Sequence, residues 1–226
     1  WYLFYADYGH GGTPTPISVS TATNVAGPYT YVGPVLTSTY AWEAYRVDEP
    51  FVFQRNDGKW ILLYMGDSGG AHEQVSYASA DNILGPYTKY GSTPAIPFGA
   101  AGSYDAGTVA DPWVVEFHGT YYIGYTVSSS TSSPWQTAYA TTTDWQTFTK
   151  QGLTLPLASS GWDSSNSFRG AVTRVGNTYV FSYTGDGYMM GIATQPVYST
   201  ITLNDPSTIF SFFDDFPGAA LDTTKW

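Results

Sequence analysis

The stretch VDEPFVF at residues 47–53 returns in related form as VADPWVV at residues 109–115 and as SFRGAV at residues 167–172. Each copy opens an apolar strand with an ionic residue, which is Glu49, Asp111 or Arg169 in turn. The copies lie about 60 residues apart, and self-similarity at a fixed period of this length is typical of propeller blades or solenoid coils. In a propeller, one repeated position would place these ionic residues around one axis.

Each copy is followed by two further strand patterns. An aromatic segment comes first, with WILLY at 60–64, YYIGY at 121–125 and YVFSY at 179–183. A segment of small residues follows, with VSYAS at 75–79, TAYAT at 137–141 and MGIAT at 190–194. Short strands separated by Gly, Pro, Asn and Asp predict antiparallel sheets, and no segment keeps the 3.6-residue apolar period of a helix. We therefore predict an all-β propeller of four-stranded antiparallel blades with almost no helix, and a core that contains the recurring Tyr64, Tyr125 and Tyr183.

The repeat divides the chain into four blades, at 1–40, 41–100, 101–160 and 161–213. The first segment, WYLFY at 1–5, matches the second strand of the later repeats, so the first repeat lacks its innermost strand and we expect a piece of a longer chain with further domains. We predict a propeller over 1–208, and over 209–226 a linker and the beginning of a concanavalin-like β-sandwich. Alternatively, this tail completes the last blade's edge strand or replaces the absent first strand.

Composition excludes several classes of partner. The formal net charge is −10, and an acidic surface repels phosphate, which argues against nucleic acid and anionic membranes. The sequence contains no stretch of 18 apolar residues, so no membrane span is predicted. The absence of cysteine excludes disulfides and thiolate metal sites. No cofactor is predicted; a Ca²⁺ ion on the propeller axis would suit oxygen ligands, but no loop motif supports one. The Thr, Ser, Gly and Tyr content is typical of bacterial proteins that are secreted or held at the cell surface.

The chain resembles a known family at these same motifs. The acidic residue before proline at the strand opening, DGKW at 57–60, YASAD at 77–81 and GPY at 85–87 resemble the five-bladed propeller glycosidases of glycoside hydrolase family 43. The resemblance covers nearly the whole chain up to about residue 205. It implies a five-bladed propeller, of which about four blades are visible, and hydrolysis of glycosidic bonds in arabinose- or xylose-containing polysaccharides.

That family uses three carboxylates: an Asp base on the first blade, an Asp that orients and tunes on the second, and a Glu acid on the third. This sequence departs from the pattern in three ways. The first inner strand is absent, the next two present Glu49 and Asp111 in place of the order Asp then Glu, and the fourth offers Arg169.

Glycoside hydrolysis needs one protonated and one ionised carboxyl group on either side of the scissile bond. We predict Glu49 as the general acid, Asp111 as the base or pKa-tuning partner, and Arg169 as a substrate-holding residue. Asp48 is a third catalytic candidate, although adjacent strand residues face opposite sides, so only one of Asp48 and Glu49 is expected to face the site.

The loops that enter the first strands and those that join second to third strands supply the remaining candidates. The predicted substrate-binding residues are Trp42, Glu43, Arg46, Asp67, His72, Asp105, Trp135, Trp162 and Asp163. The same loops also carry Asp7, His10, Glu73 and Asp186.

Each of these residues also has a structural interpretation. A carboxylate before proline can cap a turn by accepting nearby backbone N–H groups, and the tryptophans can pack between blades. The predicted partner is a carbohydrate, and the predicted activity is that of a secreted glycoside hydrolase. The alternatives are a non-catalytic glycan-binding propeller and a structural module of an extracellular protein.

Overall fold

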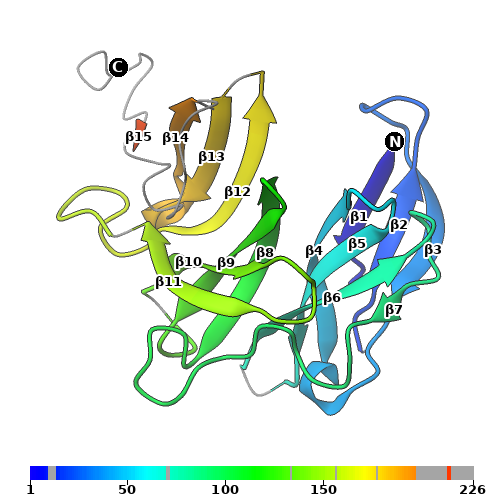
Figure 1. Cartoon of the computed structure of the whole chain (residues 1–226), viewed down its shortest axis with the longest axis horizontal. Helices are drawn as coiled ribbons and strands as arrows, with labels where there is room; N and C mark the ends of the chain where they lie inside the picture. The colour runs from blue at the N-terminus through cyan, green and yellow to red at the C-terminus, as the bar shows by residue number, and fades with distance from the viewer. Residues whose placement is uncertain are drawn as a thin grey trace. The chain divides into compact units, whose positions relative to one another are not determined.

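The computed structural model describes residues 1–9, 14–69, 72–132, 134–155, 157–176, 178–196 and 213–214, and it is all-β over them (Figure 1). Its helical segments within this part of the chain are two single 3₁₀ turns, η1 (Ala41–Glu43) and η2 (Asp186–Tyr188). The prediction of an all-β chain with almost no helix is therefore confirmed.

The strands form four antiparallel sheets that follow the predicted repeats (Figure 1). The first sheet has the order β1-β2-β3 and the second β4-β5-β6-β7, followed by β11-β10-β9-β8 and β12-β13-β14-β15. The strands of the first two sheets are β1 (Tyr2–Ala6), β2 (Ile17–Thr21), β3 (Thr30–Leu36), β4 (Arg46–Gln54), β5 (Trp60–Asp67), β6 (Gln74–Ala80) and β7 (Thr88–Lys89). Those of the last two are β8 (Thr108–Phe117), β9 (Thr120–Ser128), β10 (Gln136–Thr142), β11 (Thr149–Leu155), β12 (Phe168–Val175), β13 (Thr178–Thr184), β14 (Met190–Pro196) and β15 (Phe213–Asp214).

The first sheet has three strands within the described residues, and β1 pairs with β2 as the second strand of a repeat should. Closure of the sheets into a five-bladed ring stays a prediction. The chain divides into two compact units: Trp1–Pro112 with Ser129–Thr131, and Trp113–Ser128 with the chain from Ser132 onward.

The strand β5 lies between β4 and β6 and is almost entirely buried. All of β5 except Trp60 is buried, and Phe51, Val52 and Phe53 of β4 pair with it in register. Tyr64, Tyr125 and Tyr183 occupy equivalent places on β5, β9 and β13, and each is at most 1% exposed. Their predicted place in the core is confirmed.

A bulge interrupts the first strand of the repeat at the ionic residue. Glu49, Asp111 and Arg169 all have positive φ, at 53°, 48° and 51°. The pairing register shifts at Glu49 in β4 and again at Arg169 in β12. Positive φ is uncommon for a residue other than glycine, and β-bulges re-aim a side chain next to functional sites. The repeat therefore preserves a backbone conformation as well as a sequence position.

The C-terminal tail is described only at β15, which pairs with β14 through Ile192 with Asp214 and Ala193 with Phe213. This pairing corresponds to the alternative in which the tail supplies an edge strand to the last sheet. The rest of the tail, where a concanavalin-like β-sandwich is predicted to begin, lies outside the described residues.

Gly66 on β5 provides a test of the packing, since a Cβ at this position would lie 2.2 Å from Cζ3 of Trp42 and 2.8 Å from Cβ of Glu43. We expect Gly66→Ala to lower the free energy of unfolding by about 1–3 kcal/mol, because a packed core cannot absorb the extra methyl group without shifting. The measurement is urea unfolding followed by tryptophan fluorescence. Gly91→Ala is the matched control, since a Cβ there meets no atom within 4 Å. Equal unfolding midpoints for the two variants would contradict the close packing of Trp42 and Glu43 against Gly66.

Candidate active site

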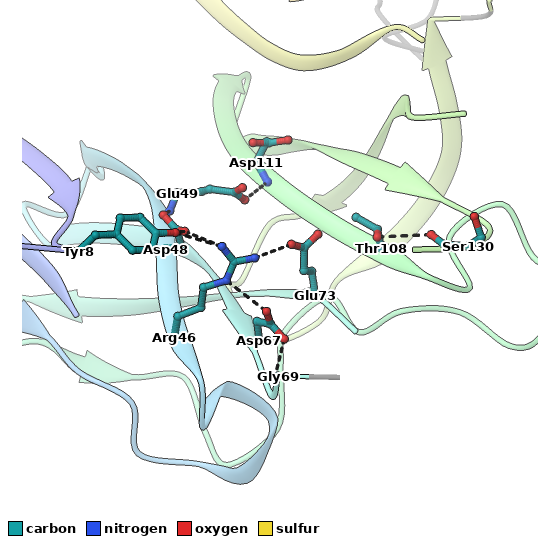
Figure 2. Close-up of polar contacts among 10 residues, drawn as sticks. All are labelled: Tyr8, Arg46, Asp48, Glu49, Asp67, Gly69, Glu73, Thr108, Asp111 and Ser130. Atoms are coloured by element: carbon teal, nitrogen blue, oxygen red, sulfur yellow. Dashed lines mark hydrogen bonds and ion pairs between the residues drawn. The ribbon is translucent and has the colours of Figure 1, made fainter. Parts of the chain in front are cut away.

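The guanidinium of Arg46 is the centre of a cluster of polar side chains at one end of the second sheet (Figure 2). Its Nε donates to Asp67 Oδ2 at 3.1 Å, one terminal nitrogen to Asp48 Oδ2 at 3.2 Å and the other to Glu73 Oε1 at 2.8 Å. The nitrogen that binds Asp48 also donates to the Tyr8 hydroxyl at 3.0 Å, and this hydroxyl donates to Asp48 Oδ2. We call Tyr8, Arg46, Asp48, Asp67 and Glu73 the Arg46 cluster.

The strand pattern explains why these residues meet. Arg46 and Asp48 are two residues apart on β4, so their side chains leave the same face of the strand. Asp67 ends β5 directly opposite Arg46 in register, and Glu73 lies just before β6 begins. Arginine suits the central position because its planar guanidinium offers five N–H donors in a fixed arrangement.

Glu49 and Asp111 meet beside the Arg46 cluster (Figure 2). The backbone N–H of Asp111 donates to Glu49 Oε2 at 2.6 Å, and the backbone N–H of Glu49 donates to Asp48 Oδ1 at 2.7 Å. The predicted pair of Glu49 and Asp111 is thus brought together by a contact between residues 62 positions apart in the chain.

The bulge at Glu49 breaks the regular alternation of the strand, so alternation alone does not decide which of Asp48 and Glu49 faces the site. The Asp48 carboxylate accepts from Arg46 with one oxygen and from the Glu49 backbone with the other. Both residues therefore belong to one connected set of hydrogen bonds.

The environment favours the protonated form of Glu49. Burial raises the pKa of the Glu49 carboxyl well above its ordinary value, the negative charge of Asp111 adds to this, and the hydrogen bond from the Asp111 backbone opposes it. Burial also raises the pKa of Glu73, although the positive charge of Arg46 works in the other direction. A carboxyl group whose pKa is raised by burial and a neighbouring carboxylate is a candidate for an acid–base role.

Arg169 lies in the second compact unit and occupies the third copy of the bulge. Its backbone N–H donates to Thr126 Oγ1 at 2.9 Å, and its exposed guanidinium lies 5.4 Å from the centre of the Phe168 ring. Its role as a substrate-holding residue stays a prediction.

Two predicted pairs of an aromatic and an acidic residue have a structural place instead. Trp42 stacks on Tyr64 with ring centres 5.9 Å apart, and Glu43 accepts a hydrogen bond from the Tyr64 hydroxyl at 3.0 Å. In the second unit Trp162 stacks on Tyr183 at 5.5 Å, and Asp163 accepts from that hydroxyl at 3.0 Å. The Glu43 side chain is 0% exposed and Asp163 is also buried. These contacts argue against substrate binding by the two acids and favour the alternative that both tryptophans pack into the protein.

Three other predicted residues also lie in local contacts. Asp105 is buried and accepts from the Ser103 hydroxyl at 2.7 Å. Trp135 packs on Phe168 with ring centres 5.2 Å apart. His72 is exposed and stacks on Phe98 at 4.8 Å. His10 lies outside the described residues.

The sequence predicts no role for Tyr8, and Glu73 is predicted only as a loop residue. Both have tertiary partners far away in the chain, since Tyr8 bonds to Asp48 and Glu73 bonds to Arg46. The position of Glu73 just before β6 could have predicted that it lies near Asp67, since the start of β6 is opposite the end of β5. No sequence pattern marks Tyr8.

Within the part of the chain that the structure describes, no group of three or more His, Asp or Glu side chains is arranged to hold a metal ion. Nor does this part contain a helix that is long and apolar enough to cross a membrane.

Comparisons with known proteins agree with this fold. No protein-family model matches the sequence. The chain is 31% identical over 155 residues to arabinan endo-1,5-α-L-arabinosidase A of Aspergillus aculeatus, a match that covers 65% of this chain and 45% of the relative. The chain thus spans less than half the length of this curated relative.

Two solved structures share the fold at low sequence identity. A thermostable family-43 glycoside hydrolase aligns with a TM-score of 0.64 and 18% identity over 87% of this chain and 67% of its own. The α-L-arabinofuranosidase from Lactobacillus brevis aligns with a TM-score of 0.67 and 14% identity over 93% of this chain and 68% of its own. The chain thus has the fold of a class of carbohydrate-active enzymes. Within that class, the predicted resemblance to propeller glycosidases of the glycoside hydrolase family 43 type is confirmed.

The buried ion pair between Lys89 and Glu43 provides a test of the structural role assigned to Glu43. Their side chains are 9% and 0% exposed, and Lys89 Nζ also donates to the Thr37 carbonyl at 2.7 Å. We expect Lys89→Met to lower the free energy of unfolding by about 3–5 kcal/mol, because Glu43 would be left as a buried charge without its cation.

Chemical unfolding measures the effect of Lys89→Met, and Lys59→Met is the control. The Lys59 and Asp81 side chains form an ion pair while 44% and 88% exposed, so its loss should change stability by less than about 1 kcal/mol. Similar losses in both variants would contradict a buried structural role for the Lys89 pair.

The raised pKa of Glu49 predicts how stability depends on pH. As pH rises above the ordinary carboxyl pKa, the unfolded chain releases this proton while the folded chain keeps it, so the stability contributed by Glu49 falls until the pH passes the raised, folded-state pKa. Glu49→Gln carries no such proton, so we expect its melting temperature to rise relative to the wild type between acidic and neutral pH.

Asp57→Asn is the control, because the hydrogen bond from Arg55 lowers the pKa of Asp57 to about 2. The stability contributed by Asp57 therefore rises with pH, opposite to that of Glu49. Thermal melts of the wild type and both variants across pH make the comparison. A Glu49→Gln difference that stays constant with pH would show that Glu49 titrates normally.

Proposed function

We propose that this chain is part of a glycoside hydrolase that cleaves glycosidic bonds in arabinose-containing polysaccharides. The observation that carries the proposal is the Glu49 carboxyl, which accepts the Asp111 backbone N–H and whose pKa burial raises well above its ordinary value. A carboxyl group kept protonated beside a second carboxylate is what general acid catalysis of this reaction needs. The similarity to an arabinan endo-1,5-α-L-arabinosidase supports α-1,5-arabinan as the first substrate to test.

The two oxygens of Glu49 have different tasks in this proposal. Oε2 accepts the N–H of Asp111, so the proton sits on Oε1. As the bond between the anomeric carbon and the glycosidic oxygen breaks, Oε1 gives its proton to the leaving oxygen. In the same step Asp111 takes a proton from the water that attacks the anomeric carbon. In a double-displacement reaction Asp111 instead attacks this carbon itself, and water, deprotonated by Glu49, then hydrolyses the glycosyl–Asp111 ester.

The Arg46 cluster supports this division of roles electrostatically. Arg46 holds Asp48 and Glu73 by hydrogen bonds of 3.2 and 2.8 Å, and the remaining negative charge around Glu49 favours its protonated form. Since a polysaccharide does not cross a membrane, the proposed action takes place outside the cell, where the protein is secreted or held at the surface. A bacterial source stays a prediction.

The second candidate is a glycan-binding propeller that does not hydrolyse its ligand. The specific observation in its favour is Arg169, which stands in the third copy of the bulge where the first two copies carry carboxylates. A guanidinium there can bind sugar hydroxyls but cannot act as a general acid.

Hydrolysis assays distinguish the two candidates. We expect Glu49→Gln and Asp111→Asn each to lower kcat on α-1,5-arabino-oligosaccharides by about 10²–10⁴-fold, the usual contribution of a general acid or base. The loss in Glu49→Gln should be much smaller on an aryl arabinofuranoside with a good leaving group, because that oxygen needs no proton. The wild-type kcat/KM should fall on the alkaline side as Glu49 loses its proton.

Asp81→Asn is the matched control, because its carboxylate is 88% exposed on a turn and its loss should leave kcat unchanged. A wild type that binds arabino-oligosaccharides in calorimetry without releasing product would support the glycan-binding module. Hydrolysis that survives both Glu49→Gln and Asp111→Asn would show that the catalytic pair lies elsewhere.

A further inference from the structure

Tyr8 combines an exposed ring with a fixed hydroxyl. The residue is 64% exposed, yet its hydroxyl accepts from Arg46 at 3.0 Å and donates to Asp48 Oδ2. Figure 2 shows the ring beside Asp48 at the edge of the Arg46 cluster. An aromatic side chain that points into solvent usually turns freely, whereas here both polar contacts hold its far end in place.

Asp48 links Tyr8 to the proposed general acid. One Asp48 oxygen accepts from the Tyr8 hydroxyl, and the other accepts from the Glu49 backbone N–H at 2.7 Å. The position of the Tyr8 ring is therefore fixed relative to Glu49 through one carboxylate. A ligand bound over Glu49 would meet a rigid aromatic surface on this side.

The chemistry of this arrangement suits a sugar ring. The C–H face of a sugar is apolar and packs on an aromatic ring, while its hydroxyl groups need acceptors and donors at the rim. The Asp48 carboxylate and the Arg46 guanidinium lie at the hydroxyl end of the Tyr8 ring. A tyrosine whose hydroxyl is already bonded also loses little freedom when the ligand binds, which increases affinity.

We propose that Tyr8 is the aromatic platform on which a sugar residue of the substrate rests beside the bond to be cleaved. The inference rests on the proposed function and names a specificity-determining residue for it. Tyr8 takes the part predicted for Trp42 and Trp162, whose indole rings are instead stacked on the buried tyrosines of β5 and β13.

Two substitutions separate the platform from a positioning role of the hydroxyl. Tyr8→Phe keeps the ring and removes the hydroxyl, whereas Tyr8→Ala removes both. If Tyr8 is a platform, we expect Tyr8→Ala to raise KM by about tenfold, the effect of losing one aromatic stacking contact. Its kcat should change by less than about threefold. The KM of Tyr8→Phe should stay within about threefold of the wild-type value, because the ring is kept. Tyr31→Ala on β3 is the matched control, since Tyr31 is also exposed, at 43%, and should have a wild-type KM.

The assays use the 226-residue chain with arabino-, xylo- and manno-oligosaccharides, and calorimetry with the Glu49→Gln variant measures binding without turnover. An equal decrease of kcat in Tyr8→Phe and Tyr8→Ala would contradict the platform role of the ring. In that case the hydroxyl alone would act, through Asp48. A wild-type KM in Tyr8→Ala, with hydrolysis intact, would overturn the platform and leave the proposed function standing. Absence of both binding and turnover with every oligosaccharide would overturn the two together.

Discussion

The site depends on one guanidinium, that of Arg46, which holds three carboxylates within hydrogen-bonding distance. Asp48, Asp67 and Glu73 come from β4, from the end of β5 and from the residue just before β6, and like charges gathered around one group repel each other. Arg46 offsets that repulsion and fixes each oxygen by a directed hydrogen bond. Without this cation, the ends of these strands could not hold so many acids together.

The second constraint is the backbone conformation that recurs at Glu49, Asp111 and Arg169. Positive φ at a residue with a side chain costs free energy of about 1–3 kcal/mol, and such strain is typical of functional sites. At Asp111 and Arg169 the backbone N–H donates to a side-chain oxygen, of Glu49 and Thr126 respectively. The bulge therefore creates N–H groups that side chains of the preceding repeat can bind, and in the first compact unit this is how Glu49 meets Asp111.

Sequence periodicity was enough to predict the sheets, the buried tyrosines and the shared repeat position of Glu49 and Asp111. It could not predict the bulge, because strict alternation is the default for a strand and nothing in Asp48-Glu49-Pro50 requires a positive φ. It also could not predict the packing of Trp42 and Glu43 against Tyr64, since an aromatic next to an acid is equally typical of sugar sites and of packed loops. Tyr8 was missed because its role depends on Asp48 and Arg46, which are about 40 residues away in the chain.

The contacts of Lys89 have a consequence for how the first two repeats behave as a folding unit. Lys89 lies on β7, the edge strand of the second sheet, and its ammonium bonds to the Thr37 carbonyl just after β3 of the first sheet. Its carboxylate partner, Glu43, lies in the connection between the two sheets. In repeat proteins each module often opens almost independently of its neighbours. Here the first sheet cannot separate from the second without exposing a buried ion pair, so amide protons in both sheets should exchange with solvent in a single cooperative opening.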